Sequence, residues 1–442
     1  MMRSMFSGVS GLRAHQARLD VIGNNIANVN TVGYKASRVT FQEVFSQTLR
    51  GSGAPDTSTG RGGTNPMQIG LGMGVASVDM QFTRGSVQRT DNPTDLSIEG
   101  EGMFIVRGGS ADAYRFTRAG NFTVDKMGNL VASNGMSVYG WQYHEADPNN
   151  PGARIFDTER NVEPINIYAD SYNGNKKIIA PHSTDQVALS GNLNLNDAVA
   201  DPPVILPLTV FDAFGNEYKI EVQFQQSGVD HVWNYTITEA DGINRFTDVP
   251  GTITFDDTPG NEGKAIDATG GAAGAGLVRD ITLDLSTIDS ALTDINFDLD
   301  LSKITQYATD SSAKVYSANG YNSGTLVTFN IGTDGVITGI YSNGQQQPLG
   351  LVALASFENS AGLQKVGENM YIATSNSGDF KKPTRPGGEG LGTLNPGTLE
   401  MSNVDLSKEF TEMITTQRGF QANSRIITTT DEMLNELVNI KR

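Results

Sequence analysis

The sequence predicts a mainly β protein with an α-helix at each end, folded as a nested multi-domain subunit. Three observations support this prediction. Apolar residues recur every seven positions near both ends of the 442-residue chain, apolar and polar residues alternate through the middle, and 50 glycines supply turns. The length favours more than one hydrophobic core. The two terminal helices are expected to pair as a coiled coil, with β-rich middle and outer domains looped out between them.

The first predicted element is a coiled-coil helix within residues 1–35, because residues 3–30 lack proline and carry an apolar ridge. Gly8, Gly11 and Gly23 interrupt this segment, and each costs roughly 1 kcal/mol relative to alanine in a helix interior. The helix should therefore be marginal alone and should form when partners cover its ridge. We call the following residues the N-terminal ridge: Met5, Val9, Leu12, Leu19 and Ile26.

The last predicted element is a coiled-coil helix within residues 403–442, preceded by a Gly- and Pro-rich linker at 386–402. Ser402 and Asp405 fit a capping box at its start. An intramolecular pair packed on the β domain would explain both apolar ridges, but their position at the two chain ends favours contacts between copies. We call the following residues the C-terminal ridge: Leu406, Phe410, Met413, Phe420, Ile427 and Leu434.

Between the helices the apolar pattern changes to a period of two, which is typical of strands. Residues 36–90 are predicted as an extended linker, with one short helix at 42–49 and a loop at 51–74. A discontinuous middle β domain is predicted over 91–177 and 317–385. An outer β domain over 178–316 is predicted as an insertion in it. Whether this insertion forms one domain or two remains open at this stage.

Composition argues against several function classes. A net charge of −17, concentrated in the middle of the chain, disfavours nucleic-acid binding. The absence of cysteine excludes disulfides and thiolate chemistry. No apolar run is long enough for membrane insertion, and Ser4, Ser7 and Arg13 interrupt what would be a cleaved signal peptide.

Motifs for chemistry are equally scarce. The four histidines have no metal-ligand spacing, and no phosphate loop or serine-hydrolase elbow is present. The acidic residues at 294–300 alternate with apolar ones, so they indicate a solvated strand face more than a calcium loop. We therefore predict no enzyme activity, no catalytic residue, no cofactor and no metal site.

Several segments resemble the bacterial flagellar rod and hook protein family. Residues 6–12 (Phe-Ser-Gly-Val-Ser-Gly-Leu) and 19–35 (Leu-Asp-Val-Ile-Gly-Asn-Asn-Ile-Ala-Asn-Val-Asn-Thr-Val-Gly-Tyr-Lys) are similar to its N-terminal signature. Residues 402–407 (Ser-Asn-Val-Asp-Leu-Ser) and 417–423 (Gln-Arg-Gly-Phe-Gln-Ala-Asn) are similar to its C-terminal signature. Residues 96–106, 116–122 and 341–344 resemble the shared β domain, whereas 178–316 matches only loosely. The size of that block favours the hook branch of the family over the distal rod branch.

This resemblance implies a structural subunit of a helical homopolymer, a flexible extracellular tube that passes torque from rod to filament in motility. It implies contacts with itself, the distal rod protein, the hook cap protein, the hook–filament junction protein and the flagellar type III export apparatus. Export through the flagellar channel would explain the lack of a cleaved signal peptide. A secreted β-rich adhesin or a secreted polysaccharide-active enzyme remain as alternatives, and neither requires apolar ridges at both ends.

Overall fold

The computed structural model describes residues 2–55, 60, 62–108, 113–147, 150–172, 174–239, 246, 250–269, 277–285, 294–378, 380, 382–388 and 390–440. The chain divides into two compact units. Unit 1 comprises Met1–Gly174, Phe329–Thr338 and Pro348–Arg442, and unit 2 comprises Asn175–Thr328 and Gly339–Gln347. The insertion expected at 178–316 falls within the sequence range of unit 2.

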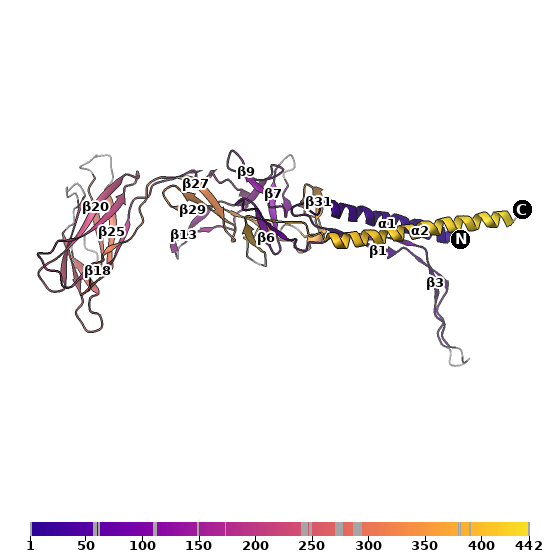
Figure 1. Cartoon of the computed structure of the whole chain (residues 1–442), viewed down its shortest axis with the longest axis horizontal. Helices are drawn as coiled ribbons and strands as arrows, with labels where there is room; N and C mark the ends of the chain where they lie inside the picture. The colour runs from indigo at the N-terminus through magenta and orange to yellow at the C-terminus, as the bar shows by residue number, and fades with distance from the viewer. Residues whose placement is uncertain are drawn as a thin grey trace. The chain divides into compact units, whose positions relative to one another are not determined.

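Two helices at opposite ends of the chain lie side by side in unit 1 (Figure 1). They are α1 (Met2–Ala27) and α2 (Leu406–Ile440), and they run antiparallel. The predicted helix pairing is therefore confirmed. The predicted capping box at Ser402 is wrong, because the side chain of Asp405 accepts the N–H groups of Ser407 and Lys408 at 2.9 and 3.2 Å.

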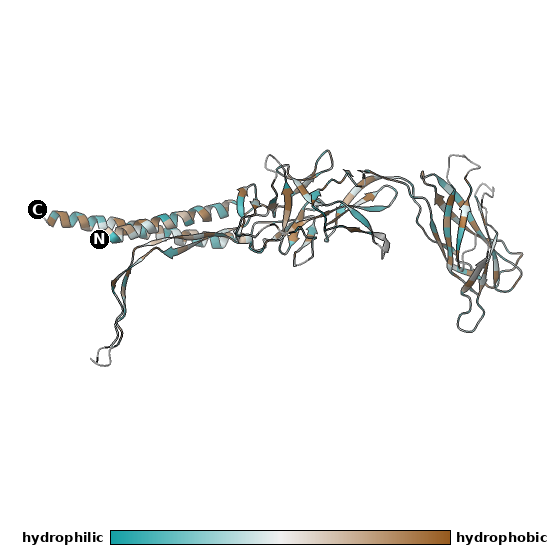
Figure 2. Ribbon diagram, turned by 180° about the vertical axis from the view of Figure 1, so that it is seen from behind, coloured by the Kyte–Doolittle hydropathy of each residue, from teal (hydrophilic) through white to brown (hydrophobic). Residues whose placement is uncertain are grey.

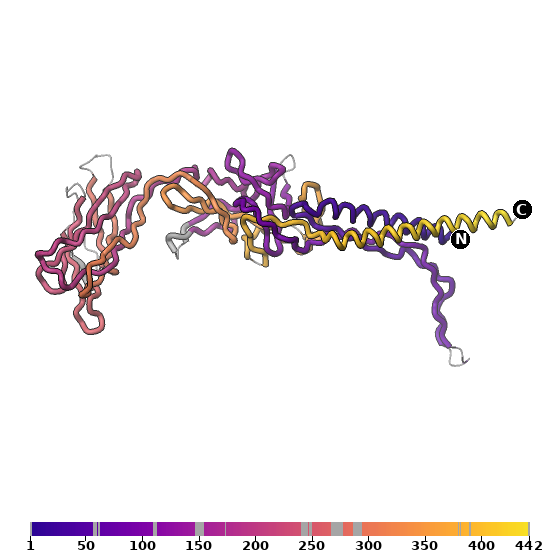
Figure 3. The backbone as a smooth tube through the Cα atoms, viewed as in Figure 1, coloured from indigo at the N-terminus to yellow at the C-terminus, as the bar shows by residue number. Residues whose placement is uncertain are grey.

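The segment after α1, predicted as an extended linker, is instead a paired ribbon. Strand β1 (Ser37–Glu43) pairs antiparallel with β4 (Met73–Met80), and β2 (Ser46–Arg50) pairs with β3 (Met67–Gly70). The predicted helix at 42–49 and loop at 51–74 are therefore wrong. The two chain segments of β2 and β3 run together as an arm that leads away from the helices (Figures 1 and 3). Pairing with a strand more than twenty residues away overrides the local helical spacing of the apolar residues.

A β domain completes unit 1. Its sheet runs in the order β29-β11-β7-β8-β32-β31. One face of the sheet packs around Met103, Ile105, Phe116, Trp141 and Tyr371. The strands outside the arm and outside the sandwich of unit 2, with one 3-10 helix, are β5 (Val87–Arg89), β6 (Leu96–Glu99), β7 (Met103–Arg107), β8 (Arg115–Thr117), β9 (Phe122–Val124), β10 (Leu130–Ala132), β11 (Ser137–Trp141), β12 (His144–Asp147), β13 (Asn150–Phe156), β14 (Glu163–Pro164), β15 (Ala169–Asp170), β16 (Gly174–Asn175), β17 (Ile178–Ile179), β27 (Gly324–Ile331), β28 (Val336–Tyr341), β29 (Gln346–Val352), β30 (Leu354–Ala355), η1 (Ser360–Gly362), β31 (Gln364–Gly367), β32 (Met370–Ile372), β33 (Thr393–Pro396) and β34 (Thr398–Glu400).

The chain segment before α2 is tied into this domain. Strand β33 pairs with β6, and β34 pairs with β5. The prediction of a linker at 386–402 is therefore wrong for its second half. Short strands of three or four residues are difficult to recognise in a Gly- and Pro-rich segment, because their partners lie about 300 residues earlier in the chain.

Unit 2 is a sandwich of two sheets, ordered β24-β25-β18-β26 and β19-β20-β21-β22-β23. Large apolar side chains of both sheets, including Phe297 and Trp233, belong to one core cluster, so the insertion forms one domain. The alternating acidic residues of β25 face away from this core, as predicted. The strands of this sandwich are β18 (Gln186–Asn194), β19 (Val204–Phe211), β20 (Glu217–Gln226), β21 (Val232–Glu239), β22 (Gly251–Phe255), β23 (Ala265–Thr269), β24 (Val278–Leu283) and β25 (Ile295–Tyr307), with β26 (Lys314–Ala318) at one edge.

Candidate assembly surface

The contact between α1 and α2 is made by small and polar residues. An added Cβ at Gly8 would lie 3.3 Å from Cγ1 of Ile427, and one at Gly11 would lie 2.6 Å from Nδ2 of Asn423. Gly8 and Gly11 therefore let the two backbones approach closely. This role was not predicted from the sequence, where these glycines indicated only a less stable helix. Gly23 differs, because an added Cβ there meets nothing within 4 Å.

On α2, the ridge that faces α1 holds few apolar side chains. Glu409, Thr416 and Thr430 are buried and Asn423 is half-buried, at a spacing of seven residues. The hydroxyls of Thr416 and Thr430 donate to the carbonyls of Glu412 and Ile426, each at 2.6 Å, so their polar atoms are satisfied within the helix. This side of the pair gains little from the hydrophobic effect.

Most residues of the predicted apolar ridges lie beside this contact, whereas Ile427, which meets Gly8, lies within it. The N-terminal ridge is half-buried along its whole length, whereas the buried residues of α1 are Gly8, Gly11, Ala14, Ile22 and Asn25. On the C-terminal ridge, Met413, Ile427 and Leu434 are half-buried, and Leu406, Phe410 and Phe420 are exposed. Most of these side chains are therefore not fully buried within one chain, and their expected use in contacts between copies stays a prediction. A heptad pattern reports a face that is buried somewhere, and it does not say in which molecule.

Large apolar side chains remain exposed on both helices and on the arm. Phe6 of α1 is 62% exposed and Phe410 of α2 is 50% exposed. Brown, hydrophobic stretches are visible along both helices (Figure 2). Exposed apolar contact area on this scale marks an interaction surface. Besides the exposed part of the C-terminal ridge, we define the candidate assembly surface by Met2, Phe6, Ile414, Ile426, Met433, Leu437, Val438 and Ile440 of the helices, and Val44, Phe45, Leu49, Met67 and Ile69 of the arm.

Charged groups flank the helix contact. Arg18 forms an ion pair of 2.9 Å with Glu412, and its guanidinium lies 5.7 Å from the ring centre of Phe41 on β1. Burial, together with the Arg18 charge, lowers the pKa of His15, which packs against Gly419. Burial raises the pKa of Glu409, with a smaller contribution in the same direction from Glu412. Where α1 and α2 bury little apolar area against each other, close backbone packing and charged side chains therefore hold the pair together.

A buried charge cluster ties the bases of both helices to the β domain. Glu400 of β34 accepts from Lys35 at 2.7 Å and from Arg118 at 3.2 Å, and the side chains of Lys35 and Glu400 are fully buried. Burial lowers the pKa of Lys35 and of Arg118, and the Glu400 carboxylate opposes both shifts. Nζ of Lys35 also donates to the carbonyl of Thr83 at 2.8 Å.

Two asparagines extend this connection. The Asn25 side chain donates to the Ser37 carbonyl at 2.8 Å and accepts from the Ser37 N–H at 3.0 Å. The Asn403 side chain accepts from the Ala36 N–H at 2.8 Å and donates to the Gln81 carbonyl at the same distance. Asn25, Lys35, Arg118 and Asn403 all lie in the segments that carry the family resemblance. The role of these polar residues was missed, although their motifs had been recognised.

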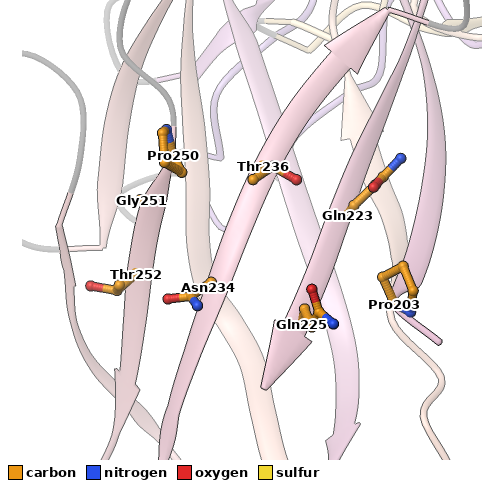
Figure 4. Close-up of a pocket in the computed structure, with 8 residues that line it drawn as sticks. All are labelled: Pro203, Gln223, Gln225, Asn234, Thr236, Pro250, Gly251 and Thr252. Atoms are coloured by element: carbon orange, nitrogen blue, oxygen red, sulfur yellow. The ribbon is translucent and has the colours of Figure 1, made fainter. Parts of the chain in front are cut away.

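The rest of the described molecule offers no comparable chemistry. No three His, Asp or Glu side chains in the described residues gather as a metal site. Neither described helix is long and apolar enough to cross a membrane. A groove of about 340 Å³ on the five-stranded sheet of unit 2 has polar walls (Figure 4). It is lined by Pro203, Gln223, Gln225, Asn234, Thr236, Pro250, Gly251 and Thr252.

Paired terminal helices, joined to a β domain and carrying exposed large apolar side chains, are the features of a structural subunit of the flagellar axis. Four family models match the chain in this order: "Flagella basal body rod protein" at residues 5–35, "Flagellar hook protein FlgE/F/G D1 domain" at 97–187, "Flagellar basal body protein FlaE D2 domain" at 206–321, and "Flagellar basal body rod FlgEFG protein C-terminal" at 395–440.

Full-length relatives narrow the identification. The chain is 40% identical to flagellar hook protein FlgE of Borreliella burgdorferi and 38% identical to that of Treponema pallidum, over 100% of both chains in each case. It is 30% identical to flagellar basal-body rod protein FlgG of Bacillus subtilis, again over 100% of both chains. The chain belongs to the FlgE family of flagellar hook proteins. It is a structural subunit of the flagellar hook, which confirms the preference for the hook branch.

Proposed function

We propose that copies of this chain polymerise into the tubular hook through the candidate assembly surface. One observation carries the proposal: the helix pair buries glycine, threonine and asparagine, and leaves Phe6, Phe410 and Val438 at least half exposed. Burying each such large apolar side chain contributes roughly 1.5–3 kcal/mol. The apolar ridges would thus supply much of the free energy of assembly, and their neighbours in the polymer would complete the core that the single chain lacks.

The contacts between copies would be heterologous, because the exposed faces of α1, α2 and the arm differ from one another. A repeated heterologous contact that does not close on itself generates a helical polymer. In this tube the helix pair would line the channel, the β domain of unit 1 would form the middle layer, and unit 2 would face outward. The protein would act by assembly alone and would not be an enzyme.

Bending of the tube requires that parts of each subunit shift against their neighbours. The predicted loop at 51–74 and the predicted linker at 386–402 contain the paired strands β3 and β33, so they are not simple flexible links. Unit 1 and unit 2 each have a hydrophobic cluster built from their own strands. Each unit would therefore keep its own fold while the tube bends.

Specific partners follow from the same proposal. Subunits at the two ends of the polymer would contact the distal rod protein and the hook–filament junction protein, with the hook cap protein guiding growth. Export through the flagellar type III channel would deliver the chain to the cell exterior. The terminal helices expose large apolar side chains until neighbouring copies cover them, so they would become fully stable only on assembly. Such helices could stay unfolded during passage through the export channel.

Charge substitutions on the apolar ridges test polymerisation. Phe410→Asp and Phe420→Asp should each abolish polymer, measured by electron microscopy and sedimentation, because each places a charge in the exposed part of the C-terminal ridge, which belongs to the candidate assembly surface. Leu195→Asp is the matched control, since Leu195 is exposed in unit 2 and lies outside both helices. Fluorescence of the buried Trp233 should be unchanged in all three variants. A polymer that persists with Asp at both ridge positions would contradict the proposal.

Immunogold electron microscopy of intact cells tests the outward placement of unit 2. Antibody raised against residues 178–316 should label a short curved segment at the base of the filament. Label that appears only after extraction of basal bodies would indicate that this domain is not exposed on an external hook.

A further inference from the structure

The C-terminal end of α2 extends beyond the first described residue of α1. Gly8 lies against Ile427 and Gly11 against Asn423, so Met2 is level with about residue 432 in this antiparallel pair. The C-terminus of α2 accordingly projects past the N-terminus of α1 (Figure 1). Residues 433–440, about 12 Å of helix at 1.5 Å per residue, have no part of α1 beside them. We call these residues the α2 overhang.

The overhang continues the α2 face that contacts α1. Leu437 follows Thr430 at the seven-residue spacing of the inner ridge, yet it is 50% exposed. Met433, Val438 and Ile440 add exposed apolar area on either side of it. This face of α2 carries small and polar residues beside α1 and large apolar residues beyond the end of α1. The apolar part is therefore suited to bind a surface other than its own α1.

A groove on α1 offers a complementary surface. It has a volume of about 520 Å³ and lies between α1 and β4. Phe6, Val9 and Arg13 form one wall, and Met73 and Val75 form the other. Phe6 is 62% exposed and Val75 is 37% exposed, so the groove offers apolar contact area beside the polar groups of Ser10 and Arg13.

The charges of the two surfaces are opposite. Between Arg425 and the final two residues, the only charged residues of α2 are Asp431, Glu432 and Glu436. The basic Lys441 and Arg442 that follow lie outside the described residues. In α1, Arg3 and Arg13 precede any acidic residue, and the first acid is Asp20. Acidic side chains around the overhang can therefore face basic ones around the groove.

We propose that the α2 overhang of one copy docks in the groove between α1 and β4 of a neighbouring copy. This inference rests on the proposed polymerisation and specifies one of its contacts. Leu437 and Met433 would lie against Phe6 and Val9, with Glu436 close to Arg13. Each α1 would then be flanked by its own α2 on one face and by the end of a neighbour's α2 on another.

The geometry makes this contact open-ended. Val9 is level with about residue 425 of its own α2, twelve residues from Leu437, which corresponds to about 18 Å along the helix axis. A neighbour that docks Leu437 at Val9 is therefore displaced by about that distance along the axis. Because the overhang and the groove are different surfaces, every added copy presents a new groove and a new overhang.

Disulfide trapping tests the contact directly, since the natural chain contains no cysteine. Hooks isolated from cells that express the double variant Val9→Cys/Leu437→Cys should give a ladder of linked chains on a non-reducing gel after mild oxidation. A bond within one chain is excluded, because about 18 Å separates positions whose Cα atoms must come within roughly 7 Å. Each single-cysteine variant should give no ladder longer than a dimer.

Two further pairs define the register and the occupant. Ala27→Cys/Leu437→Cys carries its first cysteine on the exposed side of α1 but eighteen residues further on, and should stay monomeric on the gel. A ladder from Val9→Cys/Phe45→Cys, with none from Val9→Cys/Leu437→Cys, would assign the groove to a neighbour's arm and overturn the inference. Normal hooks without any Val9–Leu437 link would overturn it while leaving polymerisation intact. Failure of the unsubstituted chain to polymerise would instead contradict the proposed function.

Charge reversal provides a second measurement that does not depend on cysteine. Arg13→Glu should raise the protein concentration needed for polymerisation, and adding Glu436→Arg should restore it towards the natural value. Arg425→Glu, an exposed reversal outside both surfaces, should change it little. Equal effects of Arg13→Glu with and without Glu436→Arg would show that the two side chains do not meet.

Discussion

The sandwich of unit 2 and the helix pair of unit 1 bury opposite kinds of side chain. The sandwich core contains Trp233, Phe224 and Phe297, each almost fully buried. The helix pair buries Gly8, Gly11 and Thr416 and leaves Phe6 and Phe410 exposed. A domain of the first kind is stable on its own, whereas an element of the second kind is completed by other molecules. The same chain thus contains one region with a complete hydrophobic core and one region whose apolar side chains would be covered only by other copies.

The junction between the helices and the β domain differs from both regions, because buried ion pairs rather than apolar side chains hold it together. Glu400 forms ion pairs with both Lys35 and Arg118 inside the protein. Such a cluster adds little net stability over an apolar core, but it is costly to break and accepts few other arrangements. We infer that it fixes how the two terminal segments leave the β domain, so that neighbouring copies meet surfaces of defined position.

The largest expected effect comes from removing the shared carboxylate of this junction. Glu400→Ala should destabilise unit 1 by about 3–5 kcal/mol, because it leaves Lys35 and Arg118 buried without a counter-charge. The two tryptophans separate the units: Trp141 lies in unit 1 and Trp233 in unit 2. Urea unfolding followed through Trp141 in a Trp233→Phe background should show the loss.

Glu99→Ala is the matched control for this prediction. Glu99 pairs with Arg84 at 3.0 Å, but both side chains are well exposed, so its removal should change the free energy of unfolding far less than Glu400→Ala does. Unfolding followed through Trp233 in a Trp141→Phe background should be the same with and without Glu400→Ala. If Glu400→Ala lowered the free energy of unfolding equally in both units, the two units would not unfold independently, contrary to this prediction.

A smaller effect distinguishes two glycines of the same helix. Gly11→Ala should weaken the helix pair by about 1 kcal/mol net, since crowding of Asn423 costs more than the helix propensity of alanine returns. Gly23→Ala should strengthen it by up to about 1 kcal/mol, because nothing crowds the new methyl group. Far-ultraviolet circular dichroism of dilute, unpolymerised protein in urea measures both changes.

This glycine pair also provides an internal check on the role of the helix contact. If both substitutions stabilise the helices equally, the close approach at Gly11 is absent in the single chain in solution. In the polymer, Gly23→Ala can lose its advantage where a neighbour approaches that face. A comparison of the dilute and polymerised states therefore separates contacts within one chain from contacts between chains.

Much of the fold could be predicted from the sequence because local patterns determine it. The seven-residue periodicity of the ends predicted both helices, and the period of two predicted strands in the middle of the chain, such as β19 and β20. The arm was missed because β2 and β3 depend on each other across a long loop, and each alone contains apolar residues at helical spacing. Pairing between distant segments leaves only a weak local signal.

The sequence pattern indicates which helices carry the candidate site, but it does not say which of their residues meet within one chain. Apolar residues at heptad spacing correctly marked both helices, yet Leu12 and Phe420 lie beside the intramolecular contact and Gly11 lies within it. A residue can be apolar because it is buried within its own chain or because it is buried against other copies in a polymer. The most apolar ridge of a helix therefore need not be the one that packs within a single chain. The cluster around Glu400 was missed because Lys35, Arg118 and Glu400 are far apart in the sequence, and charged residues are normally exposed.

The smallest expected effect concerns Glu409, the acidic residue buried in the helix contact. Its pKa is raised above the ordinary value of 4.5, chiefly by burial, so the folded state holds this proton more tightly than the unfolded state does. The helix pair should therefore be most stable below about pH 4.5 with respect to this group, and should lose that contribution as pH rises through the higher folded-state pKa. Asn25, Glu412, Lys408 and Arg18 also face Glu409.

Glu409→Gln isolates this effect from the titration of its neighbours. The substitution keeps the shape of the side chain and removes the charge, so it should stabilise the helix pair above pH 6 and have little effect near pH 4. Urea midpoints of dilute protein, followed by circular dichroism from pH 4 to 8, give the difference between the two chains. His15, whose pKa is lowered, titrates in both and cancels in that difference. A difference that is constant over this range would show that Glu409 is solvated in the single chain, and that the contact between α1 and α2 is looser there than in the structure.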